Sequence, residues 1–138
     1  MKGILRYAAL TQNDSNFRNT LMKEIEKFED LEVWQAGMEL VQEIYGLTEN
    51  YPVEEKPALS SQMRTAAIKI PAKIAAAAGC GNIKISLWYL SISQGLLASL
   101  EAYLKLSVRL KYVPKVEAAP IMEKCKSIER MIDELILS

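Results

Sequence analysis

Glu101 is the residue whose setting most suggests chemistry, because it is the only acidic residue between Lys56 and Lys115. A carboxylate among basic residues could hold or transfer a proton. Hydrolysis or metal binding would need a second acid or a base beside it. A hydrogen bond or salt bridge from Glu101 to Arg64 on a neighbouring helix is the structural alternative. The sequence therefore predicts no catalytic residue at Glu101.

Other catalytic groups and cofactor ligands are missing from the sequence. The chain has 138 residues and no histidine, which removes the usual general base and the usual zinc and haem ligand. It contains no phosphate-binding loop and no Gly-x-Gly-x-x-Gly motif. Cys80 and Cys125 match no metal-ligand spacing and are expected to be reduced thiols packed on helices in a cytoplasmic protein. We therefore expect no enzyme activity, cofactor, metal or small-molecule substrate.

Basic residues are the remaining functional candidates, because charge is strongly partitioned along a chain whose net charge is zero. Residues 22–55 carry ten acidic and two basic residues, a net charge of −8. Residues 56–115 carry nine basic residues against Glu101, a net charge of +8. Such a block could neutralise RNA phosphates, and Trp88 or Tyr89 could stack on a base if exposed. Alternatively, the lysines form a solvated face and the aromatic residues belong to the core. The candidate nucleic-acid-binding residues are Lys69, Lys73, Lys84, Lys105 and Arg109.

The elements that must position these residues are helices, because apolar residues recur every three or four positions. The pattern predicts helices over Leu31–Asn50, from Pro52 to Ala78, over Ile83–Leu110, and after a turn at Tyr112–Pro114. Short turns between them favour an all-α fold, an antiparallel up-down-up-down four-helix bundle. Residues 22–138 are expected to form this domain. Residues 1–21 are expected to form an N-terminal extension, either an appended tail or part of a short extra helix. The longest uncharged run is too short to cross a membrane.

Each helix is expected to bury an apolar stripe. In the helix after Pro52, Pro71 should kink the axis. In the next, Gly95 should mark a close approach of two backbones, and Pro120 should lie in the first turn of the last helix. The expected core of the first helix is Trp34, Met38, Val41 and Tyr45, widened by Val33, Leu40, Ile44 and Leu47. The third has two stripes, Ile85, Tyr89, Ile92, Leu96, Leu100 and Tyr103, and Leu87, Leu90, Leu97 and Leu104. The last has Ile121, Cys125, Ile128, Met131 or Ile132, and Leu135.

The second helix has a small apolar face in addition to its core stripe of Met63, Ala66 or Ala67, Ile70, Ile74 and Ala77. A helix that is apolar on two sides is expected to be buried on two sides. One bundle core cannot absorb both faces, and apolar surface of this kind usually marks an interface. In a closed ring, the acidic first helix of one copy could also pair with the basic helices of the next. The candidate oligomer-interface residues are Ile68, Ala72, Ala75, Ala76 and Gly79.

Several short motifs appear in a characteristic order from about Lys27 to the C-terminus. They are Phe28–Gln35 (FEDLEVWQ), Ser61–Arg64 (SQMR), Ala67, Ile70–Ala72 (IPA), Ile74–Ala75, Gly95, Leu100–Glu101 and Tyr112–Val113. In these residues the chain resembles the four-helix-bundle family of intervening-sequence proteins, which are encoded within insertions in bacterial large-subunit ribosomal RNA genes. A related branch is the accessory variability determinant of diversity-generating retroelements.

The resemblance implies a non-enzymatic bundle that commonly assembles into a homopentameric ring. In the retroelement branch it also implies partnership with a reverse transcriptase and nucleic acid. The chain departs from the family pattern around Pro71. Lys69, Lys73, Ala76 and Ala77 replace a serine, an asparagine, a glutamate and a glycine. Two hypotheses therefore stand together: an accessory protein that binds RNA or a reverse transcriptase, and a self-assembling scaffold or protein-interaction module without nucleic-acid binding.

Overall fold

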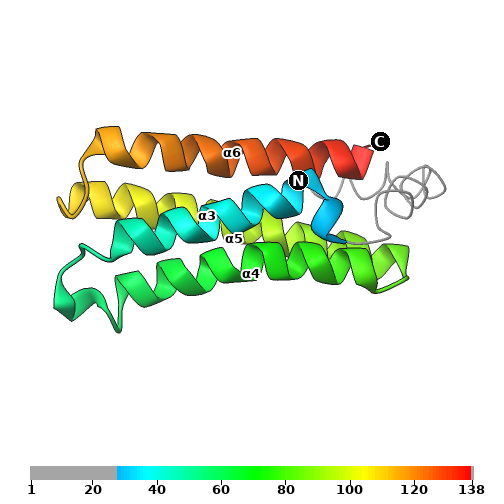
Figure 1. The fold of residues 1–138 in the computed structure, drawn as a ribbon, viewed down its shortest axis with the longest axis horizontal. Helices are drawn as coiled ribbons and strands as arrows, with labels where there is room; N and C mark the ends of the chain where they lie inside the picture. Colours follow the sequence, from blue (N-terminus) through cyan, green and yellow to red (C-terminus); the bar gives the residue numbers. More distant parts are fainter. Residues whose placement is uncertain (1–27, 138) are drawn as a thin grey trace.

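Four long α-helices make up most of the computed structural model, which describes residues 28–137 (Figure 1). They are Glu32–Thr48 (α3), Leu59–Gly79 (α4), Ile83–Arg109 (α5) and Lys115–Leu137 (α6). Single 3-10 turns, Phe28–Asp30 (η1) and Val53–Glu55 (η2), precede α3 and α4. The all-α fold class is confirmed. The predicted extension over residues 1–21, its extra helix and the domain boundary at residue 22 lie outside the described residues.

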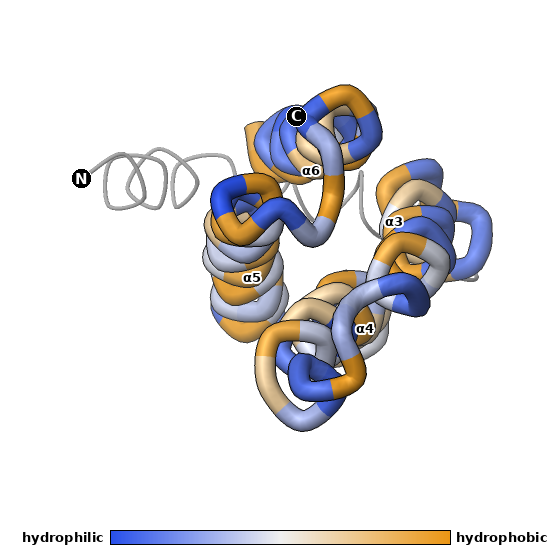
Figure 2. The backbone as a smooth tube through the Cα atoms, turned by 90° about the vertical axis from the view of Figure 1, so that its left-hand side faces the viewer, coloured by the Kyte–Doolittle hydropathy of each residue, from blue (hydrophilic) through white to orange (hydrophobic). Residues whose placement is uncertain are grey.

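Successive helices run in opposite directions, as the up-down-up-down prediction requires (Figure 1). The end-on view shows them at the corners of a quadrilateral, with α5 beside α4 and α6, and α3 beside the same two helices (Figure 2). The predicted start of the second helix at Pro52 is wrong. Ala58 leaves the helical conformation, with φ −120° and ψ −106°, so the η2 turn is separate from α4.

The core consists of aliphatic side chains from all four helices. The predicted stripe of α4 and the predicted heptad of α6 are confirmed, with Ile132 rather than Met131 at the alternative position. The largest fully buried side chains are Leu40, Ile44, Met63, Ile70, Ile74, Leu90, Leu97, Leu100, Leu104, Ile128 and Ile132.

The core stripe of α3 is not the main one that the sequence predicted. Its buried residues are Val33, Gly37, Leu40, Ile44 and Thr48, whereas Met38 and Tyr45 are 42% and 40% exposed. The cause is a close approach between helices, because a Cβ placed on Gly37 would lie only 3.3 Å from the Cβ of Pro71. Because α3 is rotated so that Gly37 faces α4, the neighbouring stripe that contains Met38 and Tyr45 faces solvent.

The sequence predicted that two helix backbones approach closely at Gly95. Within the single chain this prediction is wrong. Gly95 is exposed, and a Cβ added there would meet no atom within 4 Å. Gly37 has that role instead, against the proline that interrupts the backbone hydrogen bonds of α4. The α3–α4 contact is therefore built around a glycine and a proline.

In α5 the buried stripe contains Leu87, Leu90, Leu97 and Leu104 together with Leu100. Ile85, at the start of the other predicted stripe, is exposed, and its remaining members other than Leu100 are half-buried. Ser86, Ser93 and Ser107 complete the buried face, because small hydroxyl side chains allow α5 to lie close to α4. The Ser86 hydroxyl donates to the Ala77 carbonyl at 2.6 Å.

The connections around α5 and α6 fix where these helices begin. Gly81 has φ +69° and Asn82 caps α5, its side-chain oxygen accepting from the Ile85 amide at 3.1 Å. Pro120 was predicted in the first turn of the last helix, but α6 begins five residues earlier at Lys115. The Pro114 carbonyl accepts from the amides of Glu117 and Ala118. Pro114, rather than Pro120, therefore lies at the N-terminal boundary of α6. No helix between residues 28 and 137 has the length and hydropathy needed to cross a bilayer.

Candidate interaction surfaces

The five predicted nucleic-acid-binding residues fall into separate groups on the bundle. Lys69 and Lys73 lie one turn apart on α4, and Lys84 lies in the first turn of α5. Lys105 and Arg109 lie in the last two turns of α5, about 30 Å along the helix from Lys84 at 1.5 Å per residue. The structure therefore gathers no single patch from all five.

An aromatic pair accompanies the α4 lysines. The Trp88 ring lies 5.1 Å from the Tyr89 ring, and the Lys73 ammonium lies 5.7 Å from the centre of the Tyr89 ring. Trp88 is 56% exposed and Tyr89 is half-buried, so Trp88 meets the condition of exposure and the alternative that it belongs to the core is wrong. An exposed tryptophan could stack on a base or fill a pocket of a protein partner.

The predicted oligomer-interface residues lie on the outer side of α4, away from its core stripe. Ile68, Ala72 and Gly79 are exposed, whereas Ala75 and Ala76 are half-buried. The prediction that this helix is buried on two sides is therefore wrong for the single chain, because one bundle core accommodates only the Met63–Ala77 stripe. We use "assembly face" for the following residues of α4 and α5: Ile68, Ala72, Ala75, Ala76, Gly79, Ile85 and Trp88.

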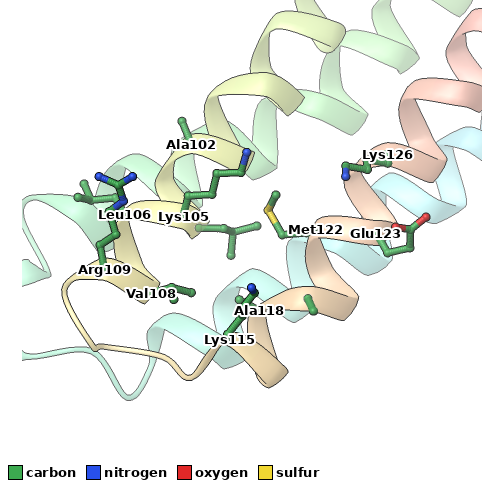
Figure 3. Close-up of a pocket in the computed structure, with 12 residues that line it drawn as sticks. Ala102, Lys105, Leu106, Val108, Arg109, Lys115, Ala118, Met122, Glu123 and Lys126 are labelled. Atoms are coloured by element: carbon green, nitrogen blue, oxygen red, sulfur yellow. The ribbon is translucent and has the colours of Figure 1, made fainter.

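A cleft between α5 and α6, with a volume of about 830 Å³, was not predicted from the sequence (Figure 3). Lys105 and Arg109 of α5 reach it from one side, and Lys115 and Lys126 of α6 from the other, with Met122 between them. Its further lining consists of Ala102, Leu104, Leu106, Val108, Ala118, Ala119 and Glu123. We call this the basic cleft.

The α6 contribution to the basic cleft could have been found by its spacing. Lys115, Ala118, Met122 and Lys126 follow one another at three or four residues, which places them on one side of a helix. That signal was missed because only the apolar heptad of this helix was used in the prediction. The heptad marks the adjacent, buried side of the helix, which Ala118 joins.

The cations of the basic cleft are not consumed by ion pairs among the described residues. The salt bridges of α6 involve Lys124, which contacts Glu39 at 2.7 Å and Glu43 at 3.1 Å, and Arg130, which contacts Glu123 at 3.4 Å. The hydrogen bond from Lys124 to Glu39 raises the pKa of the lysine. Glu123, the acid that lines the cleft, is thus paired with Arg130. None of the four lining cations forms a salt bridge within residues 28–137, and the charge of Lys126 acts on Glu129, whose pKa it lowers.

The proposed pairing of Glu101 with Arg64 is wrong. The Arg64 Nε donates to the Thr48 hydroxyl at 2.9 Å, and its guanidinium lies 4.4 Å from the centre of the Tyr45 ring, so Arg64 joins α4 to α3. Glu101 instead lies near Glu129 of α6. Burial and then the charge of Glu101 raise the pKa of Glu129.

The sequence predicted two reduced thiols, and in the structure Cys80 and Cys125 are not joined to each other. Both are free, and burial raises the pKa of the Cys125 thiol to about 12. The Cys80 sulfur lies 3.1 Å from the Ser86 hydroxyl near the α4–α5 turn. Within residues 28–137, no three side chains of cysteine, aspartate or glutamate form a group that could hold a metal ion.

Comparisons with known proteins agree on fold. The sequence model of the family described as 23S rRNA-intervening sequence protein matches residues 29–134. A crystal structure from Bacteroides thetaiotaomicron, of a protein of unknown function from the S23 ribosomal protein family, is similar with a TM-score of 0.69. The two chains are 19% identical, and the similarity covers 77% of this chain and 99% of that one. No curated protein matches the sequence.

Proposed function

Because the chain belongs to the 23S rRNA-intervening sequence protein family, we propose that it is a non-enzymatic helical bundle that assembles with copies of itself through the assembly face. The observation that carries this proposal is the exposure of three large apolar side chains, Ile68 of α4 and Ile85 and Trp88 of α5, on the same helical hairpin as the small residues of α4. Water-exposed apolar surface is costly, and clusters of it usually mark contacts with another molecule. Small side chains let a neighbouring helix approach closely.

A cyclic homo-oligomer, with five copies as the resemblance implies, is the form that we propose. A ring requires two different surfaces that fit each other. The acidic α3 is a candidate for the second surface, although Glu39 and Glu43 are already paired with Lys124 of the same chain. Because the assembly face is mostly apolar, we expect the assembly to tolerate high salt. Dissociation in salt would instead favour pairing between charged helices.

The assembly proposal is tested by the molar mass of the purified protein, measured by light scattering during size exclusion. Ala76→Lys puts a charge on the assembly face and is expected to reduce the mass to that of one chain, while the helical signal in circular dichroism is retained. Glu117→Gln makes the same change in net charge at an exposed position of α6, outside the assembly face and α3, and should leave the mass unchanged. A wild-type mass equal to one chain, or an Ala76→Lys variant with wild-type mass, would contradict the proposal.

RNA binding is the second candidate function, favoured by the exposed Trp88 beside Tyr89 and Lys73. Phosphate contacts make affinity fall steeply with salt. The test is the fluorescence anisotropy of a labelled structured RNA over a salt series. Lys69→Gln with Lys73→Gln should weaken binding, whereas Lys124→Gln should not, because Lys124 is already paired with Glu39. No binding at low salt would leave self-assembly as the function.

A reverse transcriptase is the protein partner that a relation to diversity-generating retroelements would imply, and the cytoplasm is the compartment that free thiols favour. Co-elution with a reverse transcriptase encoded beside the gene, lost in the Ala76→Lys variant, would support an accessory role of the assembled form. Without such a neighbouring gene, this assignment would lose its support.

A further inference from the structure

The basic cleft lies apart from the assembly face. Trp88 precedes Lys105 by 17 residues of α5, which corresponds to about 25 Å along the helix. The cleft is formed by the last turns of α5 and the first half of α6 (Figure 3). A ligand there would therefore contact a surface that the proposed assembly does not use, and an inference about it does not depend on that proposal.

The lining of the cleft is apolar between its cations. Leu106 is 42% exposed, and Met122 lies half-buried at the centre. Ala102 and Ala119, one on each helix, are exposed and too small to fill the space between them. An RNA backbone would satisfy the cations but would leave these apolar groups in water. An apolar ligand surface flanked by negative charge would satisfy both.

The spacing of the cations matches the length of a short helix. Lys115 and Lys126 are 11 residues apart on α6, which is about 16 Å or three helical turns. Lys105 and Arg109 lie one turn apart on the facing helix. Helices that bind in grooves present apolar residues at three- and four-residue intervals, with charged residues on either side.

We propose that the basic cleft binds an amphipathic helix of a protein partner, about three turns long, with an apolar stripe flanked by carboxylates. The stripe packs on Leu106 and Met122. The carboxylates pair with Lys105 and Arg109 on one flank and with Lys115 and Lys126 on the other. Glu123, the acid in the lining, forms its salt bridge with Arg130 rather than with one of these cations.

The probe is a fluorescein-labelled synthetic peptide of about 14 residues, long enough for the three turns, with leucines every three or four positions and glutamates beside them. Its binding to the purified wild-type protein is measured by fluorescence anisotropy. The same peptide with lysines in place of the glutamates is the first control. We expect the acidic peptide to bind at least about tenfold more tightly than the basic one.

Two double variants test separately the shape of the basic cleft and its positive charge. Ala102→Leu with Ala119→Leu fills the groove with good helix-forming residues, so the fold should be retained. Lys105→Glu with Lys126→Glu reverses its charge. Each should weaken the acidic peptide at least about tenfold. Lys69→Glu with Lys84→Glu makes the same change in net charge far from the cleft and should leave peptide affinity unchanged.

Three outcomes would overturn the proposal. Absence of binding to the wild type would do so directly. If the filled variant kept its affinity while the charge-reversed variant lost it, the cations would act as a general anion surface of the kind that RNA uses. If either cleft variant changed the mass of the wild-type assembly, the occupant would be a second copy of this chain. A labelled RNA, which needs no groove, should be insensitive to filling.

Discussion

Helix α5 packs against its two neighbours in different ways. Against α4 it places leucines and serines, with Ser93 donating to the Ile70 carbonyl at 3.4 Å and Ser107 lying 3.6 Å from the Met63 sulfur. Against α6 it places charged and amide groups, such as Gln94, which donates to Asp133 at 2.6 Å. Toward its C-terminal end α5 no longer closes on α6, and the basic cleft opens there.

This difference separates two possible binding regions by their chemistry. The α4–α5 contact consists mainly of leucine and serine side chains, and the exposed apolar residues of the assembly face suit contact with another copy of this chain. The α5–α6 side offers four cations around a small apolar floor, which suits an acidic partner. A homo-oligomer that also holds a second protein needs two such regions, and here they differ enough to be disabled one at a time.

The largest expected effect is on stability, and it distinguishes the α4 side of α5, which is tightly packed, from its α6 side, where the basic cleft lies. Ile70 is fully buried between α4 and α5, so Ile70→Ala should reduce the free energy of unfolding by about 2–5 kcal/mol. Leu106→Ala, at the edge of the cleft, should cost less than about 1 kcal/mol because this side chain is already largely exposed. Urea unfolding at one fixed protein concentration measures both. Equal losses would mean that the cleft is as tightly packed as the α4–α5 contact.

Sequence periodicity was sufficient for the fold because each helix has more apolar residues on one side than on the other. It was insufficient for the rotation of α3 and α5, where two apolar stripes lie side by side. In α3, the stripe that faces the core is set by the contact of Gly37 with Pro71, two residues 34 positions apart in the sequence. Single-helix patterns contain no information about such a contact.

The candidate surfaces were predicted unevenly for the same reason. The small residues from Ala72 to Gly79 share one helix, so their common side could be read from spacing alone. The basic cleft joins Lys105 to Lys126 from two helices, and its existence depends on how α6 lies against α5. The charge count grouped Lys84 with Lys105 because they are on one helix, although the helix length holds them far apart.

A smaller effect is expected for assembly, and it tests the assignment of the two regions directly. Trp88→Ala should weaken self-association by about 2 kcal/mol, or roughly 30-fold, because buried tryptophans contribute strongly to protein interfaces. Met122→Ala, in the basic cleft, should leave association unchanged. Sedimentation of both variants over a range of concentrations gives the dissociation constants. The reverse result, with Met122→Ala dissociating the oligomer, would assign assembly to the cleft.

The smallest expected effect concerns pH and separates the neutral side of α5 from its charged side. Burial, Glu101 and Asp133 raise the pKa of Glu129 above 4.5, and Lys126 opposes them. Just above pH 4.5 the folded protein therefore holds a proton that the unfolded chain has lost, so the stability from this group falls as pH rises. Glu129→Gln should remove that fall, and its gain over wild type should grow as pH rises from 4.5 toward 7.

Urea unfolding at several pH values measures this difference, with Glu134→Gln as the control because Glu134 is an exposed carboxylate on the same helix. The control should follow the wild-type pH curve. Because Ser93 is uncharged and its hydroxyl donates to the Ile70 carbonyl of α4, Ser93→Ala should shift stability equally at every pH. If Ser93→Ala changed the pH curve and Glu129→Gln did not, the charged contact would lie on the α4 side, and the distinction between the two sides of α5 would fail.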